Sequence, residues 1–288
     1  METSTGMVGY RTRPPPGKPG GCSIRVVHWL LVLPIGLWIT MLMGSLAGFV
    51  ALGVERGERV VFDGRLLSLI VRESVARSLF WLLLPLGMVS SAPVGVPIVG
   101  EATGAPVLLV PGSSVNRGAL AFLRTFLIHR GMAWVWAVNP RQHHTGIVEA
   151  AQALEVDVVR LATESGKAQV DLVAFGTGGL VAAWYARHLD TAGRIRRVVT
   201  IGTPWRGTKL SVFRRGRLGE DTSYGAHLLD DLVPTVPTVS IWSSDDPTVI
   251  PSSSAAPEGV QSVEIEAAGH AEMLVSARVF RAVRAALA

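Results

Sequence analysis

The sequence has a single cysteine in 288 residues, Cys22, and no internal repeat. One thiol cannot form a disulfide within a chain, so a disulfide framework is excluded and the redox compartment cannot be deduced. Cys22 could carry a palmitoyl group, but a lone cysteine in a tail is more often unmodified.

Charge is missing from a long stretch near the N-terminus. From Val26 to Val54, 29 consecutive residues carry no formal charge, and His28 is the one ionisable group among them. A helix needs about 20 apolar residues to cross a bilayer. We therefore predict a transmembrane helix over residues 26–54, after a basic Pro/Gly-rich tail at 1–25. A cleaved signal peptide is the alternative, but this stretch is longer and has a long preface, which favours a retained anchor.

A second uncharged run extends from Ser78 to Gly100 and contains three prolines. We predict a shorter transmembrane or re-entrant segment within 78–100 that gives way to a linker near Pro93. The connector between the runs, residues 55–77, mixes arginines with aliphatic residues from Arg65 to Arg77. An interfacial amphipathic helix and a solvated connector both fit this pattern. The sequence thus predicts one or two N-terminal transmembrane helices.

Positive charge is concentrated in the same third of the chain. Residues 1–100 hold nine Arg/Lys against five Asp/Glu, whereas residues 101–288 hold eighteen against seventeen. An excess beside membrane segments can meet anionic headgroups, and it is not the footprint of a nucleic-acid-binding protein. We expect membrane lipids as partners and no nucleic acid. The orientation stays open, because the tail and the connector both carry arginines.

The remainder, residues 101–288, alternates short apolar runs with helical patterns. Strands are expected at 106–110, 133–138, 170–175, 195–201, 238–242 and 261–266, and helices at 119–128, 147–165, 180–189 and the C-terminus. Such alternation predicts an α/β fold, with a doubly wound, mostly parallel sheet and a site at the carboxyl ends of its strands.

One of these strands ends in a glycine-rich turn, Gly176-Thr177-Gly178-Gly179, that leads into a helix. A nucleophile elbow, Gly-x-Ser-x-Gly, requires small residues two positions before and after its apex. An apex at Gly176 places Ala174 and Gly178 there, whereas an apex at Thr177 would place Phe175 at the crowded position. The pattern therefore indicates an elbow that has lost its hydroxyl, and it disfavours Thr177 as a replacement nucleophile.

From Pro106 onward the chain resembles the lipase/esterase branch of the α/β-hydrolase family. The resemblance rests on motifs that occur in family order, each at the end of a predicted strand. They are Pro111-Gly112, the elbow, Gly202-Thr203-Pro204-Trp205-Arg206-Gly207, the aspartates after Ile241-Trp242-Ser243-Ser244, and Gly269-His270. The resemblance implies an α/β-hydrolase fold and ester hydrolysis as the family's chemistry.

It also implies roles for individual residues. Gly176 occupies the position of the nucleophilic serine, His270 that of the general base, and Asp246 that of the acid that orients the base, with Asp245 as the less favoured choice. In such a triad the histidine takes the serine proton during attack. Glycine has no hydroxyl to give, so we expect no ordinary triad chemistry at this position.

The resemblance places the oxyanion hole at the backbone amides of Ser113 and Thr177. Pro111 stands where such lipases usually have histidine, so a hydrogen-bonding side chain is absent beside the hole. Together with Gly176, this makes two departures at the centre of the chemistry. They predict a fold that is retained for something other than turnover.

Other polar groups give weaker signals. His143-His144 has no carboxylate or cysteine at ligand spacing, which favours a solvated loop, and we expect neither a metal nor a cofactor. Basic residues near the rim face either anionic headgroups or solvent; they are Arg206, Lys209, Arg214, Arg215 and Arg217.

The sequence therefore predicts a membrane-anchored, lipase-like protein that is catalytically inactive. Its expected role is that of a lipid-binding or protein-interaction subunit of a membrane complex, with membrane lipids and other membrane-protein subunits as partners. The alternative is an active membrane-bound carboxylic ester hydrolase, an esterase or lipase.

Overall fold

The computed structural model describes residues 22–88, 104–139 and 146–288, with side chains from residue 32 onward. Most of the tail predicted at 1–25, the linker near Pro93 and the pair His143-His144 lie outside the described residues. The chain divides into two compact units, residues 1–37 and 38–288. The described part of the first unit is helical, and the site lies wholly in the second.

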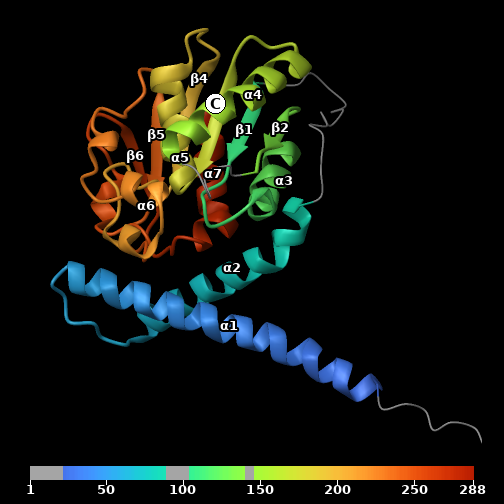
Figure 1. The fold of residues 1–288 in the computed structure, drawn as a ribbon, viewed down its shortest axis with the longest axis vertical. Helices are drawn as coiled ribbons and strands as arrows, with labels where there is room; N and C mark the ends of the chain where they lie inside the picture. The colour runs from blue at the N-terminus through green and yellow to red at the C-terminus, as the bar shows by residue number, and fades with distance from the viewer. Residues whose placement is uncertain (1–21, 89–103, 140–145) are drawn as a thin grey trace, which may run out of the picture. The chain divides into compact units, whose positions relative to one another are not determined.

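A six-stranded sheet forms the centre of the second unit (Figure 1). Its strands run in the order β2-β1-β3-β4-β5-β6, and every neighbouring pair is parallel. The strands are β1 (Val107–Val110), β2 (Val135–Ala137), β3 (Val170–Phe175), β4 (Ile195–Ile201), β5 (Thr238–Trp242) and β6 (Gln261–Glu264). The predicted α/β class and parallel sheet are confirmed. The strand order reverses between β1 and β3, which is where open α/β sheets place their sites.

Helices cover both faces of the sheet (Figure 1). Because successive strand residues point to opposite faces, Leu109 and Val173 join one apolar cluster and Leu108 and Leu172 the other. The first cluster includes α3 (Ala121–His129) and α7 (Ala277–Leu287), and the second includes α4 (Ile147–Ser165) and α5 (Thr177–Trp184). Burial on both faces explains why the central strands are continuous apolar runs.

The predicted elements differ from the observed ones mainly at their ends. The helix expected from residue 180 begins at Thr177, directly after the glycine turn, and ends in a π-helical turn, Tyr185–Leu189. The segment 209–234 contains three short helices, η3 (Lys209–Phe213), α6 (Arg217–Asp221) and η4 (His227–Leu229). Shorter turns complete the domain: η1 (Arg117–Leu120), η5 (Ser252–Ala255) and η6 (Glu272–Val275).

Two long helices precede the sheet, α1 (Cys22–Glu55) and α2 (Gly64–Met88). Within the described part of the chain, one helical stretch, Val32–Glu55, is long and apolar enough to cross a membrane, by a criterion that some signal sequences and core helices also meet. It overlaps the span predicted at 26–54. The second predicted span has no separate helix: α2 runs through residue 78 without a break, and residues 89–100 lie outside the described ones.

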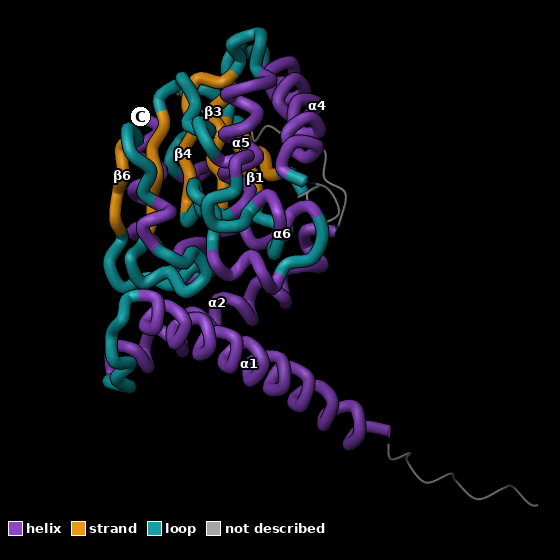
Figure 2. Tube along the Cα trace, turned by 60° about the vertical axis from the view of Figure 1, so that its left-hand side comes forward, coloured by secondary structure: helices purple, strands orange, loops and turns teal. Residues whose placement is uncertain are grey.

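The Trp38–Glu55 part of α1 and the helix α2 pack on the domain through a third apolar cluster. Phe49 and Leu52 of α1 meet Leu69 and Ile70 of α2, and Ile250 joins them from the domain. Gly48 permits a close approach, since a Cβ there would lie 2.8 Å from the carbonyl oxygen of Pro247. These helical segments lie below the sheet in Figure 2, and they line a cavity together with Ser114 and His270, which follow β1 and β6 in the chain.

The predicted connector is therefore largely a packed helix. Buried residues of α2 such as Leu69 and Glu73 contradict the solvated alternative for this segment. Its arginines contact the domain: Arg56 and Arg65 approach Asp245, Arg72 pairs with Glu272, and Arg77 bonds Thr248. Charge that we expected to face headgroups is thus largely engaged within the protein, because the helix brings these side chains onto acidic and polar groups of the loops.

Candidate active site

The glycine turn after β3 has the backbone geometry of a strained apex. Gly176 adopts φ +54° and ψ −128°, a region that residues with a Cβ rarely enter. Its N–H donates to the Ile201 carbonyl at 2.9 Å, and its carbonyl accepts from the Thr203 hydroxyl at 2.9 Å. Two residues on, a Cβ at Gly178 would lie 2.5 Å from the carbonyl oxygen of Pro111. The close approach that requires a small residue there matches an apex at Gly176.

His270 and Asp246 form a buried pair at the ends of two neighbouring strands. His270 Nδ1 lies 2.6 Å from Asp246 Oδ2, and both side chains are buried. The other carboxylate oxygen accepts the N–H groups of Thr248 at 2.7 Å and Val249 at 3.1 Å. Asp246 is thus fixed on both oxygens and can orient the imidazole.

Asp245, the alternative acid, points elsewhere. Its Oδ2 lies 2.6 Å from Arg65 Nη2 and accepts the N–H of Ala267 at 3.2 Å. The neighbouring aspartates therefore have different partners. Asp246 contacts His270, and Asp245 joins α2 to the loop that follows β5.

The position that would carry a nucleophile faces the histidine. An ideal Cβ built on Gly176 would lie 3.3 Å from His270 Nε2 and 3.6 Å from Cε1. Glycine presents only hydrogen there. No side-chain hydroxyl of the described residues is hydrogen-bonded to Nε2. The structure thus places Gly176, His270 and Asp246 together, with the imidazole bonded to the carboxylate and facing a residue that has no side chain.

The two residues expected to form the oxyanion hole are also adjacent, but they bond to each other. The N–H of Ser113 donates to the Thr177 hydroxyl at 2.9 Å in a buried contact. An oxyanion would have to displace that hydroxyl to reach the Ser113 amide. The sequence interpretation considered Thr177 as an amide donor or a replacement nucleophile and missed this third role, in which its side chain satisfies the amide.

A residue of α2 supports the histidine loop, and the sequence interpretation missed it entirely. Glu73 is fully buried and accepts the N–H groups of Ala271 at 3.1 Å and Glu272 at 3.0 Å. Its charge is balanced by Arg77 Nε at 2.7 Å. Gly269 allows the contact, because a Cβ there would lie 2.5 Å from Glu73 Oε2. The available signal was a lone acidic residue among the arginines of an amphipathic segment.

Burial also acts on the neighbouring carboxylate. Desolvation raises the pKa of Glu272 above its ordinary value, although its bond from the Gly269 N–H and the charge of Arg72 act in the opposite direction. Glu272 Oε1 lies 3.1 Å from Arg72 Nη1. The loop that carries the histidine is therefore held to α2 in two ways. Glu73, which is paired with Arg77 on the same helix, accepts two of its backbone N–H groups, and Arg72 pairs with Glu272 of the loop.

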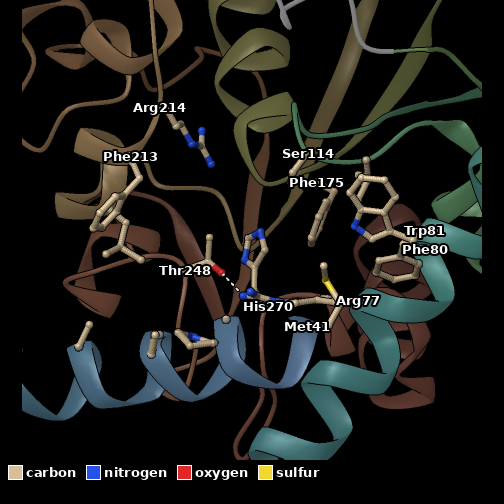
Figure 3. Close-up of a pocket in the computed structure, with 18 of the residues that line it drawn as sticks. Met41, Arg77, Phe80, Trp81, Ser114, Phe175, Phe213, Arg214, Thr248 and His270 are labelled. Atoms are coloured by element: carbon tan, nitrogen blue, oxygen red, sulfur yellow. Dashed lines mark hydrogen bonds between the residues drawn. The ribbon is translucent and has the colours of Figure 1, made fainter. Parts of the chain in front are cut away.

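A cavity of about 710 Å³ lies beside His270 (Figure 3). One wall consists of small and flexible residues of α1, including Met41, Gly44 and Gly48, and another consists of the α2 side chains Phe80 and Trp81. The domain contributes the apolar Leu210, Phe213, Phe175 and Val115, the hydroxyls of Ser114 and Thr248, and the bases Arg214 and His270, while α2 adds Arg77. The cavity is mainly apolar, and His270 is one of its few polar lining side chains.

The basic residues predicted near the rim make different contacts. Lys209 Nζ pairs with Glu55 at 2.7 Å, Arg217 pairs with Glu149, and Arg214 lines the cavity. Within residues 22–88, 104–139 and 146–288, no group of three or more His, Cys, Asp or Glu side chains is arranged to hold a metal ion.

Comparison with known structures identifies the architecture. The mature lipase BlEst2 of Bacillus licheniformis matches with a TM-score of 0.59 and 14% identity, over 67% of this chain and 96% of that one. Its propeptide form matches at 0.52 with 13% identity, over 66% and 52% of the two chains. The domain has an α/β-hydrolase fold.

A structure of the metagenome-derived lipolytic enzymes LipS and LipT also matches this α/β-hydrolase domain, with a TM-score of 0.50, 13% identity and coverage of 64% and 95%. At such identities the likeness shows the fold and not the activity. No protein-family model and no curated protein matches the sequence. Function must therefore be argued from the residues of the site.

Proposed function

We propose that this chain is a membrane-anchored α/β-hydrolase-fold protein that has given up ester hydrolysis and binds a lipid acyl chain in its cavity, as a lipid-binding or protein-interaction subunit of a membrane complex. The observation that carries the proposal is the glycine at the apex, Gly176. An ideal Cβ built there would lie 3.3 Å from Nε2 of His270, but glycine has no side chain to present to it.

The loss of a nucleophile is decisive in such a site. Removing any member of a serine triad leaves roughly 10³- to 10⁴-fold acceleration over water, supplied by the oxyanion hole and substrate binding. Here the hole is compromised as well, since the Thr177 hydroxyl occupies the Ser113 amide. Removing one oxyanion donor alone costs about 10²- to 10³-fold. The two defects together support an inactive site.

Exposed apolar side chains on α1 support the membrane anchor. Val32, Leu33, Ile39 and Met43 are 53%, 64%, 49% and 52% exposed, within a helix long enough to span. A contiguous apolar surface of this kind is unfavourable in water, whereas the hydrocarbon of a bilayer accommodates it.

The cavity supports the choice of a lipid acyl chain as ligand. Its walls are largely aliphatic and aromatic, and one wall belongs to the same helix, α1, that we assign to the membrane. Burial of a methylene group contributes about 0.8 kcal/mol, so an acyl chain of ordinary length gains much by leaving water for such a cavity.

The proposal is tested with the full-length chain, purified in detergent and assayed with p-nitrophenyl butyrate and p-nitrophenyl palmitate. We expect the unaltered chain and the His270→Ala variant to hydrolyse both esters at equal rates. The reason is that His270 has no nucleophile from which to take a proton. Lipase-like rates that His270→Ala abolishes would contradict the inactive-site proposal.

An active ester hydrolase is the second candidate, and the intact His270–Asp246 contact at 2.6 Å favours it. This candidate requires another hydroxyl as nucleophile. The two candidates are Thr177, which follows Gly176 directly, and Ser113 in the loop after β1. It predicts that the same assay reports turnover and that a single Thr177→Ala or Ser113→Ala substitution removes it.

A further inference from the structure

Two arginines line the cavity, and within residues 22–88, 104–139 and 146–288 a side-chain partner is found for one of them. Arg77 Nε lies 2.7 Å from Glu73 Oε1, and its Nη2 donates to the Thr248 hydroxyl at 3.0 Å. Arg214 enters from the loop after η3, and Figure 3 shows its guanidinium directed into the region where His270 lies. The Nη1 atom of Arg214 is buried and has no hydrogen-bond partner in the described part of the chain.

An unpaired guanidinium in such a place is unusual. Arginine carries its charge at all physiological pH values and has five donors, so a buried one is normally paired with an acid or with several acceptors. Desolvation lowers the pKa of Arg214 from its ordinary value, and no acidic group opposes this effect. Arg214 as a residue is half-buried, so its guanidinium is placed to receive a negatively charged group from a molecule in the cavity.

We propose that the cavity binds a long-chain fatty acid, with its carboxylate on Arg214 and its alkyl chain along the apolar walls. This rests on the proposed lipid-binding function and names the chemical class of its ligand. A carboxylate supplies one negative charge and two acceptors to a planar guanidinium, which matches the single unpaired cation of the cavity.

Other lipid classes fit less well. A neutral ester or alcohol would leave the half-buried Arg214 guanidinium without a countercharge. A phosphate monoester carries up to two negative charges, and the second cation of the cavity, Arg77, is already neutralised by Glu73. The volume of about 710 Å³ lies within the roughly 300–1,000 Å³ range of small-molecule sites, a size suited to a single chain.

Binding of tritiated palmitate and tritiated hexadecanol to the detergent-purified full-length chain tests the proposal. The ligands share their alkyl chain and differ in charge. We expect palmitate to bind about tenfold to a hundredfold more tightly, the range of a charge-assisted pair. Arg214→Met should remove this preference by weakening the binding of palmitate alone. Arg215→Met, a change at the exposed neighbour, should leave the binding of both ligands unchanged.

A second readout is the thermal midpoint of the ligand-free protein. If Arg214 has no partner within the chain, Arg214→Met removes a buried charge and the midpoint should stay equal or rise. A lower midpoint would mean that Arg214 is paired internally, and it would overturn the proposal. Equal loss of both ligands in Arg214→Met would also overturn it, because the residue would then merely shape the cavity.

The remaining outcomes separate this inference from the function on which it rests. If the wild-type chain binds hexadecanol as tightly as palmitate, the fatty-acid assignment is wrong while acyl-chain binding stands. If the wild-type chain binds neither ligand, both the fatty-acid assignment and the lipid-binding function are wrong.

Discussion

The two sides of this site are built differently. On one side, His270 and Asp246 keep a 2.6 Å contact inside a buried hydrogen-bond network. On the other, the apex is Gly176 and the Thr177 hydroxyl occupies the Ser113 amide. The first side has an oriented imidazole, and the second has neither a side-chain hydroxyl at residue 176 nor a free Ser113 amide.

The difference follows from what holds each side in place. The histidine loop is fastened by Glu73, whose carboxylate bonds two backbone amides just beyond His270 and pairs with Arg77. Loss of these contacts would leave buried polar groups unpaired, so the fold itself requires them. Nothing comparable requires a hydroxyl at Gly176, since a glycine removes backbone strain at φ +54°. Well-preserved base geometry is therefore no proof of turnover.

The largest expected effect comes from breaking the support of the histidine side. Glu73→Ala should destabilise the protein by about 3–5 kcal/mol, because it leaves the Arg77 charge and two amides without their buried partner. Thermal unfolding in detergent measures this, and hydrogen exchange at Ala271 and Glu272 should accelerate. Glu58→Ala is the control, since that side chain is 65% exposed. An unchanged midpoint for Glu73→Ala would show that the loop holds itself.

A smaller effect is expected from rebuilding the nucleophile side. Gly176→Ser alone should restore little esterase activity, because Pro111 and the Thr177 hydroxyl still compromise the hole. Adding Thr177→Ala frees the Ser113 amide, so the double variant should exceed Gly176→Ser by about 10²-fold in kcat, the contribution of one oxyanion donor. The readout is the kcat for p-nitrophenyl butyrate.

Two controls accompany these variants. Thr177→Ala without the serine should be inactive, and His270→Ala should abolish any activity of the double variant. If Gly176→Ser by itself reaches lipase-like rates, the side formed by Gly176, Thr177 and Ser113 lacks only one hydroxymethyl group. The contrast between the two sides then disappears.

The smallest effect concerns pH. Burial raises the folded-state pKa of Glu272 above its ordinary value of 4.5, so ionisation of this group opposes folding above that pKa. The cost is absent below the unfolded pKa and is complete once the pH exceeds the folded pKa. The stability of Glu272→Gln relative to wild type should therefore improve as the pH rises from about 4 to about 7.

Thermal midpoints at the two pH values measure this, and Glu258→Gln at an exposed position provides the matched control. A relative stability of Glu272→Gln that falls with rising pH would mean that the pairing of Glu272 with Arg72 outweighs its burial. The histidine side would then be held by more charge than we infer.

Local patterns predicted the sheet and the glycine apex well. Continuous apolar runs locate β1, β3 and β4, and the small residues at Ala174 and Gly178 select the register of the turn. These features depend on neighbours in sequence or on burial of whole strands, so the sequence carries them directly. The order of the motifs along the chain suggested the pairing of His270 with Asp246.

Long-range polar contacts could not be predicted in this way. Glu73 lies 198 residues from Ala271, whose amide it binds, and nothing near Glu73 in the sequence indicates that partner. The connector was interpreted as a separate segment because its arginines suggested solvent or headgroups, whereas packing of α2 brings them onto the domain. Arg214 was considered a rim residue for the same reason, whereas it lines the cavity together with residues of α1 and α2.

Covalent labelling with a fluorophosphonate probe tests the central claim most directly. The probe phosphonylates an activated serine or threonine hydroxyl and needs no knowledge of the natural substrate. With the full-length chain in detergent, followed by peptide mass spectrometry, we expect no labelled hydroxyl in the cavity, and labelling only after Gly176→Ser is combined with Thr177→Ala. Labelling of Thr177, Ser113 or Ser114 in the unaltered chain, lost in His270→Ala, would show a working hydrolase and contradict the account.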